Sequence, residues 1–159
     1  MPTSTFVALA TFTATGSETS VTFSSIPASY RDLVLVVAGT ASTATQIFGR
    51  LNSDSGSNYS NVYMRGYSSG TQSSSATQSY FQGTYLGSSA TQFIMQIMDY
   101  SATDKHKTVL NRLDRDGATQ TFAFAERWAS TSAVTSVDLT LNSGTVSSGT
   151  TFSLYGIEA

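Results

Sequence analysis

The sequence offers few residues that could carry catalysis. It has a single histidine, His106, flanked by Lys105 and Lys107. A serine-hydrolase site needs a histidine base that an acid orients and that touches the nucleophile. The many serines make chance proximity to a histidine easy, so proximity alone would not indicate such a site. We therefore expect His106 to be a solvated residue at a strand end, and we expect the protein not to be an enzyme.

Two segments carry acidic or amide oxygens at alternating positions. Asp114 and Asp116 are two residues apart, as a glycosidase acid pair on one strand face would be, but Gly117 follows directly and favours a turn. Residues 52–58 and 114–117 also resemble calcium loops in part, yet neither has a distal bidentate glutamate at the right offset. Turns rich in Asn and Asp reach the same composition for backbone reasons. We expect no metal and no cofactor.

A group of tyrosines surrounds a polar stretch in the middle of the chain. Residues 68–79 are almost only Ser, Thr, Gly, Gln and Ala, which predicts a long flexible loop. A tyrosine combines stacking area with a polar tip, which suits contacts with sugars or proteins. The group either shields the edge of the core or forms an interaction surface, and its members are Tyr59, Tyr63, Tyr67, Tyr80 and Tyr85.

Alternation of apolar and polar residues with a period of two runs through most of the chain and predicts β-strands. About ten short strands follow one another at regular spacing, separated by turn signals, with no significant helix. Residues 33–37 are apolar on both faces, which predicts a central strand covered on both sides. We expect one all-β domain over residues 1–159, an antiparallel β-sandwich of the jelly-roll type.

Two apolar segments are candidates for contact with other subunits of an assembly. The first is the N-terminal strand pattern that contains Phe6 and Phe12. The second is an apolar edge near Met95, Ile97 and Met98. Only 11% of the residues are charged, and charged residues are depleted at the cores of interfaces.

Composition excludes several classes of protein. A net charge of −2 and a pI near 5.1 argue against binding nucleic acid, which needs a basic face. The absence of cysteine excludes disulfides and thiolate metal sites. Residues 1–14 contain no Lys or Arg, so we expect no signal peptide and synthesis in the cytoplasm of the cell that makes the protein. No run reaches the length of about 18 apolar residues that a membrane helix needs.

Several segments, in order along the chain, resemble small virion structural proteins of tailed bacteriophages. One is the stretch from Arg50 to Ser60, which is similar to their Arg-hydrophobic-Asn-Gly-Asp-x-Gly-x-Asn-Tyr pattern, with Ser53 in place of the glycine. The other segments are residues 24–35, 99–101 with 107–110, 127–134 and 149–157.

The resemblance implies a structural protein of the virion, without fixing whether it belongs to the head or the tail. We expect a head decoration or cement protein, trimeric, that contacts the major capsid protein or other virion proteins. The two apolar segments described above are the candidates for contact with the capsid or with other subunits. The alternative is the head of a tail fibre or spike that binds a glycan of the host surface. We expect no contact with a membrane.

Overall fold

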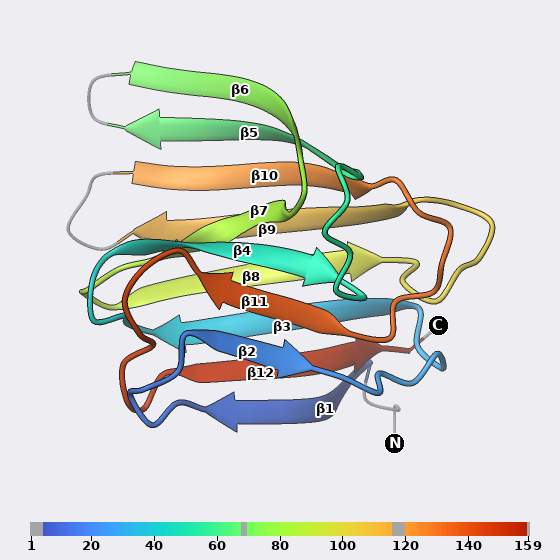
Figure 1. Ribbon diagram of the computed structural model, residues 1–159, viewed down its shortest axis with the longest axis horizontal. Coiled ribbons are helices and arrows are strands. Elements are labelled where there is room, and N and C mark those ends of the chain that lie inside the picture. Colours follow the sequence, from blue (N-terminus) through green and yellow to red (C-terminus); the bar gives the residue numbers. More distant parts are fainter. Residues whose placement is uncertain (1–4, 68–69, 116–119, 159) are drawn as a thin grey trace.

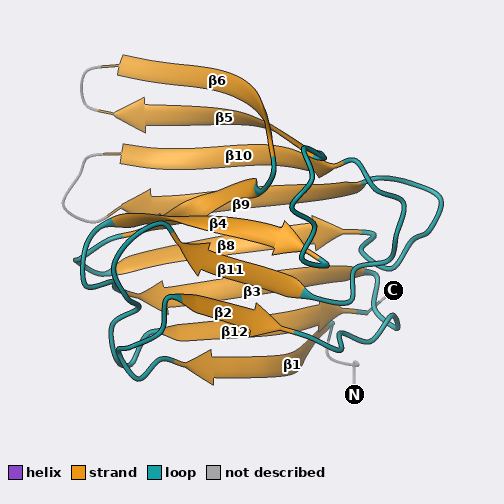
Figure 2. Cartoon of the chain, viewed as in Figure 1, coloured by secondary structure: helices purple, strands orange, loops and turns teal. Residues whose placement is uncertain are grey.

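Two antiparallel β-sheets pack face to face in the computed structural model, which describes residues 5–67, 70–115 and 120–158 (Figure 1, Figure 2). No helix occurs among these residues, and so none that could cross a membrane. The larger sheet has the order β1 (Phe6–Thr13), β12 (Thr151–Ile157), β3 (Asp32–Gly39), β8 (Thr91–Met98), β9 (Lys107–Arg115), β10 (Gln120–Trp128), β5 (Tyr59–Tyr67) and β6 (Gly70–Gln78). The smaller sheet has the order β2 (Ser20–Phe23), β11 (Val137–Leu141), β4 (Thr45–Leu51) and β7 (Phe81–Leu86).

The connectivity is that of a jelly roll. Strand β1 pairs with β12, β2 with β11, β3 with β8 and β4 with β7, all antiparallel. These four pairs are the successive rungs of one long hairpin, and the hairpin is rolled so that its rungs alternate between the two sheets. The predicted all-β, jelly-roll-like sandwich is therefore confirmed, with twelve strands in place of about ten.

The remaining four strands form two hairpins that widen the larger sheet. Hairpins β9–β10 and β5–β6 add to the edge at β8, in the order β9-β10-β5-β6. Figure 1 shows β5 and β6 extending beyond the smaller sheet. Strand β7 of the smaller sheet packs against β9, β10 and β5. The larger sheet is thus wider than the sheet that covers it.

The core lies between the two sheets. In β8 the side chains alternate, with Phe93, Met95 and Ile97 buried against the smaller sheet. In β4 a glycine leaves room for a buried ring, because a Cβ atom at Gly49 would lie 1.9 Å from the ring of Phe81. The core therefore depends on close fit as well as on apolar composition.

The flexible loop predicted for residues 68–79 is wrong over residues 70–78. This segment is strand β6, which pairs in register with β5 from Tyr59 opposite Gln78 to Tyr67 opposite Gly70. An edge strand outside the sandwich needs backbone hydrogen bonds and little apolar surface, so a polar sequence can form one. Residues 68 and 69 lie outside the described part of the chain.

Candidate functional site

The face of the larger sheet that points away from the smaller sheet is here called the outer face. The pairing of the strands shows which residues belong to the outer face, because successive side chains along a strand point to opposite faces. One row across the sheet runs through Val36, Ile94, Arg112, Ala123 and Met64 on β3, β8, β9, β10 and β5. The next row runs through Val34, Gln96, Leu110, Ala125 and Val62 on the same strands.

The outer face gathers the exposed apolar side chains of the molecule. Met64 is 64% exposed, and Phe6 is 52% exposed. Every large hydrophobic side chain that is exposed in the described part of the chain lies on this face, and the set is Phe6, Val36, Val62, Met64, Ile94, Met98 and Leu110. Contiguous apolar surface of this kind on a soluble protein marks an interaction site.

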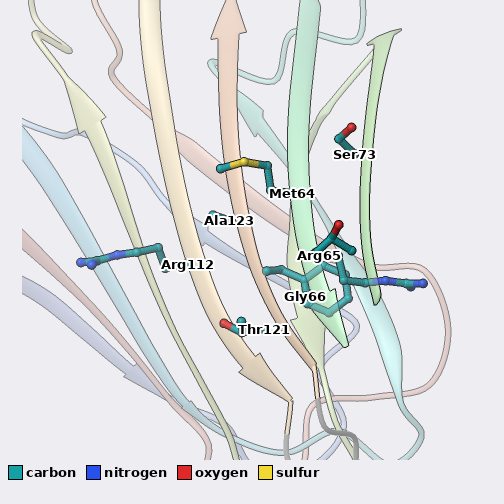
Figure 3. A pocket seen from close by; sticks show the side chains of 9 residues that line it. Met64, Arg65, Gly66, Ser73, Arg112, Thr121 and Ala123 are labelled. Atoms are coloured by element: carbon teal, nitrogen blue, oxygen red, sulfur yellow. The ribbon is translucent and has the colours of Figure 1, made fainter. Parts of the chain in front are cut away.

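Small side chains on β10 make the outer face hollow. Ala123 and Thr121 lie between the larger Met64 on β5 and Arg112 on β9 (Figure 3). The hollow has a volume of about 530 Å³. A neighbouring hollow of about 600 Å³, lined by Phe6, Ile94 and Leu110 among others, continues the depression toward β1. The surface is therefore shaped as well as apolar.

The outer face also carries charges of both signs. Arg112 and Asp114 are two residues apart on β9, and Arg127 lies at the end of β10. All three are exposed. None of them has an ion-pair or hydrogen-bond partner among the described residues. Their charges are available to a partner molecule.

The structure separates the five residues expected to contact a capsid or other subunits. Phe6 and Met98 lie exposed on the outer face. Met95 and Ile97 are buried between the sheets, so the expectation that they form surface contacts is wrong. Phe12 is half-buried, packs against the core and has its ring 6.4 Å from that of Phe152. The alternation of β8 divides its apolar residues between core and surface.

The tyrosines do not form one surface. Tyr59 is fully buried, and its hydroxyl accepts a hydrogen bond from the backbone N–H of Leu51 at 3.0 Å, so it is not part of an interaction surface. Burial raises the pKa of the Tyr59 hydroxyl to about 12. Tyr80 is half-buried and packs on the ring of Phe48, with 4.2 Å between centroids. The side chain of Tyr67 is outside what the structure describes.

Tyr63 and Tyr85, both half-buried, meet in a cleft on the other side of the sheet. The cleft has a volume of about 170 Å³ and lies where the widened sheet meets β4 and β7. Phe122 adds a third ring, and polar lining comes from side chains that include Gln46 and Gln82. The volume is below the roughly 300 Å³ typical of sites for drug-sized ligands, so it suits one small ring.

A carboxyl group that the sequence analysis missed is buried near this cleft. Glu126 on β10 is 3% exposed, and its Oε2 atom accepts a hydrogen bond from the Gln82 backbone N–H at 2.7 Å. Its Oε1 atom has no partner among the described residues. Burial raises the pKa of Glu126 to about 8, against the lowering effect of the Gln82 N–H. Glu126 takes an inner-face position of β10 at which its neighbours Phe124 and Trp128 are apolar. This break in the apolar pattern is the only sign of the buried carboxyl group in the sequence.

Of the catalytic candidates in the described part of the chain, His106 and Asp114 lie at opposite ends of β9. His106 is exposed just before β9. Asp116 lies outside the described residues, so the pair with Asp114 is untested. A Gly-x-Ser-x-Gly sequence at 66–70 joins β5 to β6, whereas a nucleophile elbow joins a strand to a helix. Among the described residues, no three His, Asp or Glu side chains come together as a metal site.

Two of the segments that resemble virion proteins, residues 50–60 and 127–134, are joined by hydrogen bonds. Asp54 accepts hydrogen bonds from the indole Nε1–H of Trp128 at 2.6 Å and from the backbone N–H of Gly56 at 2.8 Å. The Asn52 amide oxygen accepts a hydrogen bond from the Thr135 N–H at 2.7 Å, and its Nδ2 donates one to the Ala133 carbonyl at 2.8 Å. The oxygens that suggested a calcium loop are thus used by donors within the protein, and the motif is structural.

Replacing Asp54 by alanine should lower the free energy of unfolding by about 2 kcal/mol, because the Trp128 indole N–H loses its acceptor. The hydrogen bond from Trp128 lowers the pKa of Asp54, so the stabilisation is present above pH 3.8 and is lost as the pH falls further. Urea denaturation at pH 7 tests this, with Asp104→Ala at an exposed loop position as the control. Equal unfolding free energies for the two variants would contradict the structural role of the motif.

The comparisons with known proteins found no match. No family model matches the chain, and neither a curated protein nor a solved structure matches it.

Proposed function

We propose that the chain is a non-enzymatic structural protein of a bacteriophage virion, most simply a decoration protein that contacts the major capsid protein on the head. The ordered segments that resemble such proteins support this proposal. So do the hydrogen bonds that join two of these segments, from Trp128 to Asp54 and from Asn52 to Ala133. In this role the protein is made in the host cytoplasm and resides in the virion.

The observation that carries the proposal is the uncovered outer face. The apolar run at residues 33–37 has the composition of a strand covered on both sides. Within the chain the outer side of this run is covered only in part, because Val34 is buried whereas Val36 remains 36% exposed. A partner that covered the outer face would gain about 25 cal/mol of binding free energy for each Å² of apolar surface removed from water. A chain with this surface is suited to work as one part of an assembly.

Mass spectrometry of purified virions tests the proposal. We expect the chain to be present, with a copy number on the order of hundreds for a head protein and of a few to tens for a tail protein. A head protein should also bind purified expanded heads and raise their melting temperature, because a ligand that binds only the assembled state stabilises it. Absence of the chain from virions, together with no binding to heads, would refute the proposal.

A second candidate function, adhesion to a host glycan, rests on the cleft that contains Tyr63 and Tyr85. A pyranose ring offers an apolar C–H face to aromatic rings and hydroxyl groups to the amides of Gln46 and Gln82. Under this alternative, Tyr63→Ala should abolish the hits of the wild-type protein on a glycan array, whereas Tyr80→Ala should leave them unchanged. A wild-type protein without hits would refute the alternative.

A further inference from the structure

We infer that the outer face binds the outer face of a second copy of this chain, so that two jelly rolls pair back to back about a two-fold axis. The inference rests on the proposed function, because the pair would be the unit that joins the virion. Three properties of the surface favour a second copy as the occupant: its area, its charges and its pattern of large and small side chains.

The area is that of a stable protein interface. Eight strands about 4.8 Å apart, with seven to nine residues each at about 3.4 Å per residue, give a face of roughly 1,000 Å². A standard interface buries about 800 Å² on each partner. A second copy could therefore cover the apolar side chains of the whole face, from Phe6 on β1 to Met64 on β5.

The charges on the face are matched by another copy of the same face. Arg112 and Asp114 have opposite charges, are both exposed and do not pair with each other. A basic or an acidic partner would satisfy one of them and oppose the other. About a two-fold axis, a second copy brings its own Arg112 and Asp114 to the same region, so that the four side chains carry equal numbers of positive and negative charges.

The pattern of large and small side chains is self-complementary. The sheet divides between β8 and β9 into two halves of four strands. A two-fold axis along the strands at this division places the exposed Val36 of each copy opposite Ala123 of the other. Larger side chains of one half then meet the hollow along β10. The right-handed twist common to both copies lets such faces stack, as the two sheets of a sandwich do.

The axis also accounts for the position of the charges. It places Arg112 opposite Ile94, so the aliphatic stem of the arginine can pack on the isoleucine, and it gathers Arg112 and Asp114 of both copies into one cluster beside the axis. A closed trimer would require two different complementary patches on each subunit. The outer face is one patch, which is why we infer a two-fold pair in place of the trimer expected for a head decoration protein.

Sedimentation equilibrium of the purified chain tests the pair. We expect a dimer for the wild type, and a loss of affinity of roughly tenfold or more for Arg112→Asp, which leaves four carboxylates in the cluster beside the axis. Adding Asp114→Arg to Arg112→Asp restores the opposite charges in reversed order, so this double variant should dimerise again. Thr140→Asp, on the exposed outer side of β11 in the smaller sheet, is the matched control and should dimerise as the wild type does.

Cross-linking locates the contact, because the chain has no cysteine of its own. Leu110→Cys, near the proposed axis, should yield a covalent dimer with a short bis-maleimide, whereas Thr140→Cys should not. A monomeric wild type, a trimer, or a dimer that Arg112→Asp leaves intact would overturn the inference. Detection of the chain in virions despite any of these results would leave the proposed function standing, so the two failures are distinguishable.

Discussion

Replacing Glu126 by glutamine should make the protein more stable at pH 9 while changing its stability little at pH 5. The pKa of Glu126 is raised from 4.5 to about 8 in the folded protein. Between these values the unfolded chain releases a proton that the folded protein keeps, so the free energy of unfolding falls as the pH rises. At about 1.4 kcal/mol per pH unit, the loss from this group is at most about 5 kcal/mol and is complete above pH 8.

Urea denaturation of both proteins from pH 4.5 to 9 measures this difference. Glutamine keeps an acceptor for the Gln82 N–H and has no charge to desolvate, so its curve should lack the decline due to Glu126. Glu158→Gln, at an exposed position next to the end of β12, is the control and should decline as the wild type does. Parallel curves for Glu126→Gln and the wild type would show that the carboxyl group ionises normally in the folded state.

Replacing Gly49 by alanine should destabilise the fold by about 3 kcal/mol or more. The added Cβ atom would lie 1.9 Å from the ring of Phe81, which is fully buried in the core, so the ring or the strand would have to shift. Overpacking of a dense core costs about 1–3 kcal/mol, and more where the neighbour is a rigid ring. Thermal melting followed by circular dichroism measures the effect.

Two further variants make the Gly49 result specific. Gly66→Ala is the control, because its Cβ atom would lie 3.9 Å from the Thr121 methyl group, an ordinary contact, and it should be neutral or slightly stabilising. Phe81→Leu in the Gly49→Ala background should recover part of the loss by freeing space. If Gly49→Ala melted at the wild-type temperature, the close approach of β4 to the Phe81 ring would be wrong.

The sequence predicted the class of fold because period-two alternation is a local property. It could not predict which face of a strand lies inside when both faces are apolar. In β8, Met95 and Ile97 alternate with Ile94 and Met98, and either pair could have faced the core. The choice depends on which side the smaller sheet covers, and this depends on connections between strands far apart in sequence.

Polar segments gave the least reliable sequence signal. Strand β6 contains almost no apolar residue, so hydrophobic patterning predicted a loop, yet pairing with β5 is enough to hold its backbone. The inward direction of Glu126 was equally hidden, because it depends on the register of β10 between β9 and β5. The outer face, in contrast, had a signal in the doubly apolar run at residues 33–37.

Methionine oxidation footprinting tests most directly whether the outer face is covered in the assembled protein. Met64 and Met98 are exposed on this face of the isolated chain, while Met95 is buried between the sheets and serves as an internal reference. We predict that Met64 and Met98 oxidise in dilute solution and become protected at high concentration, with Met95 protected throughout. Rapid oxidation of Met64 at every concentration and in intact virions would contradict the assembly role of this surface.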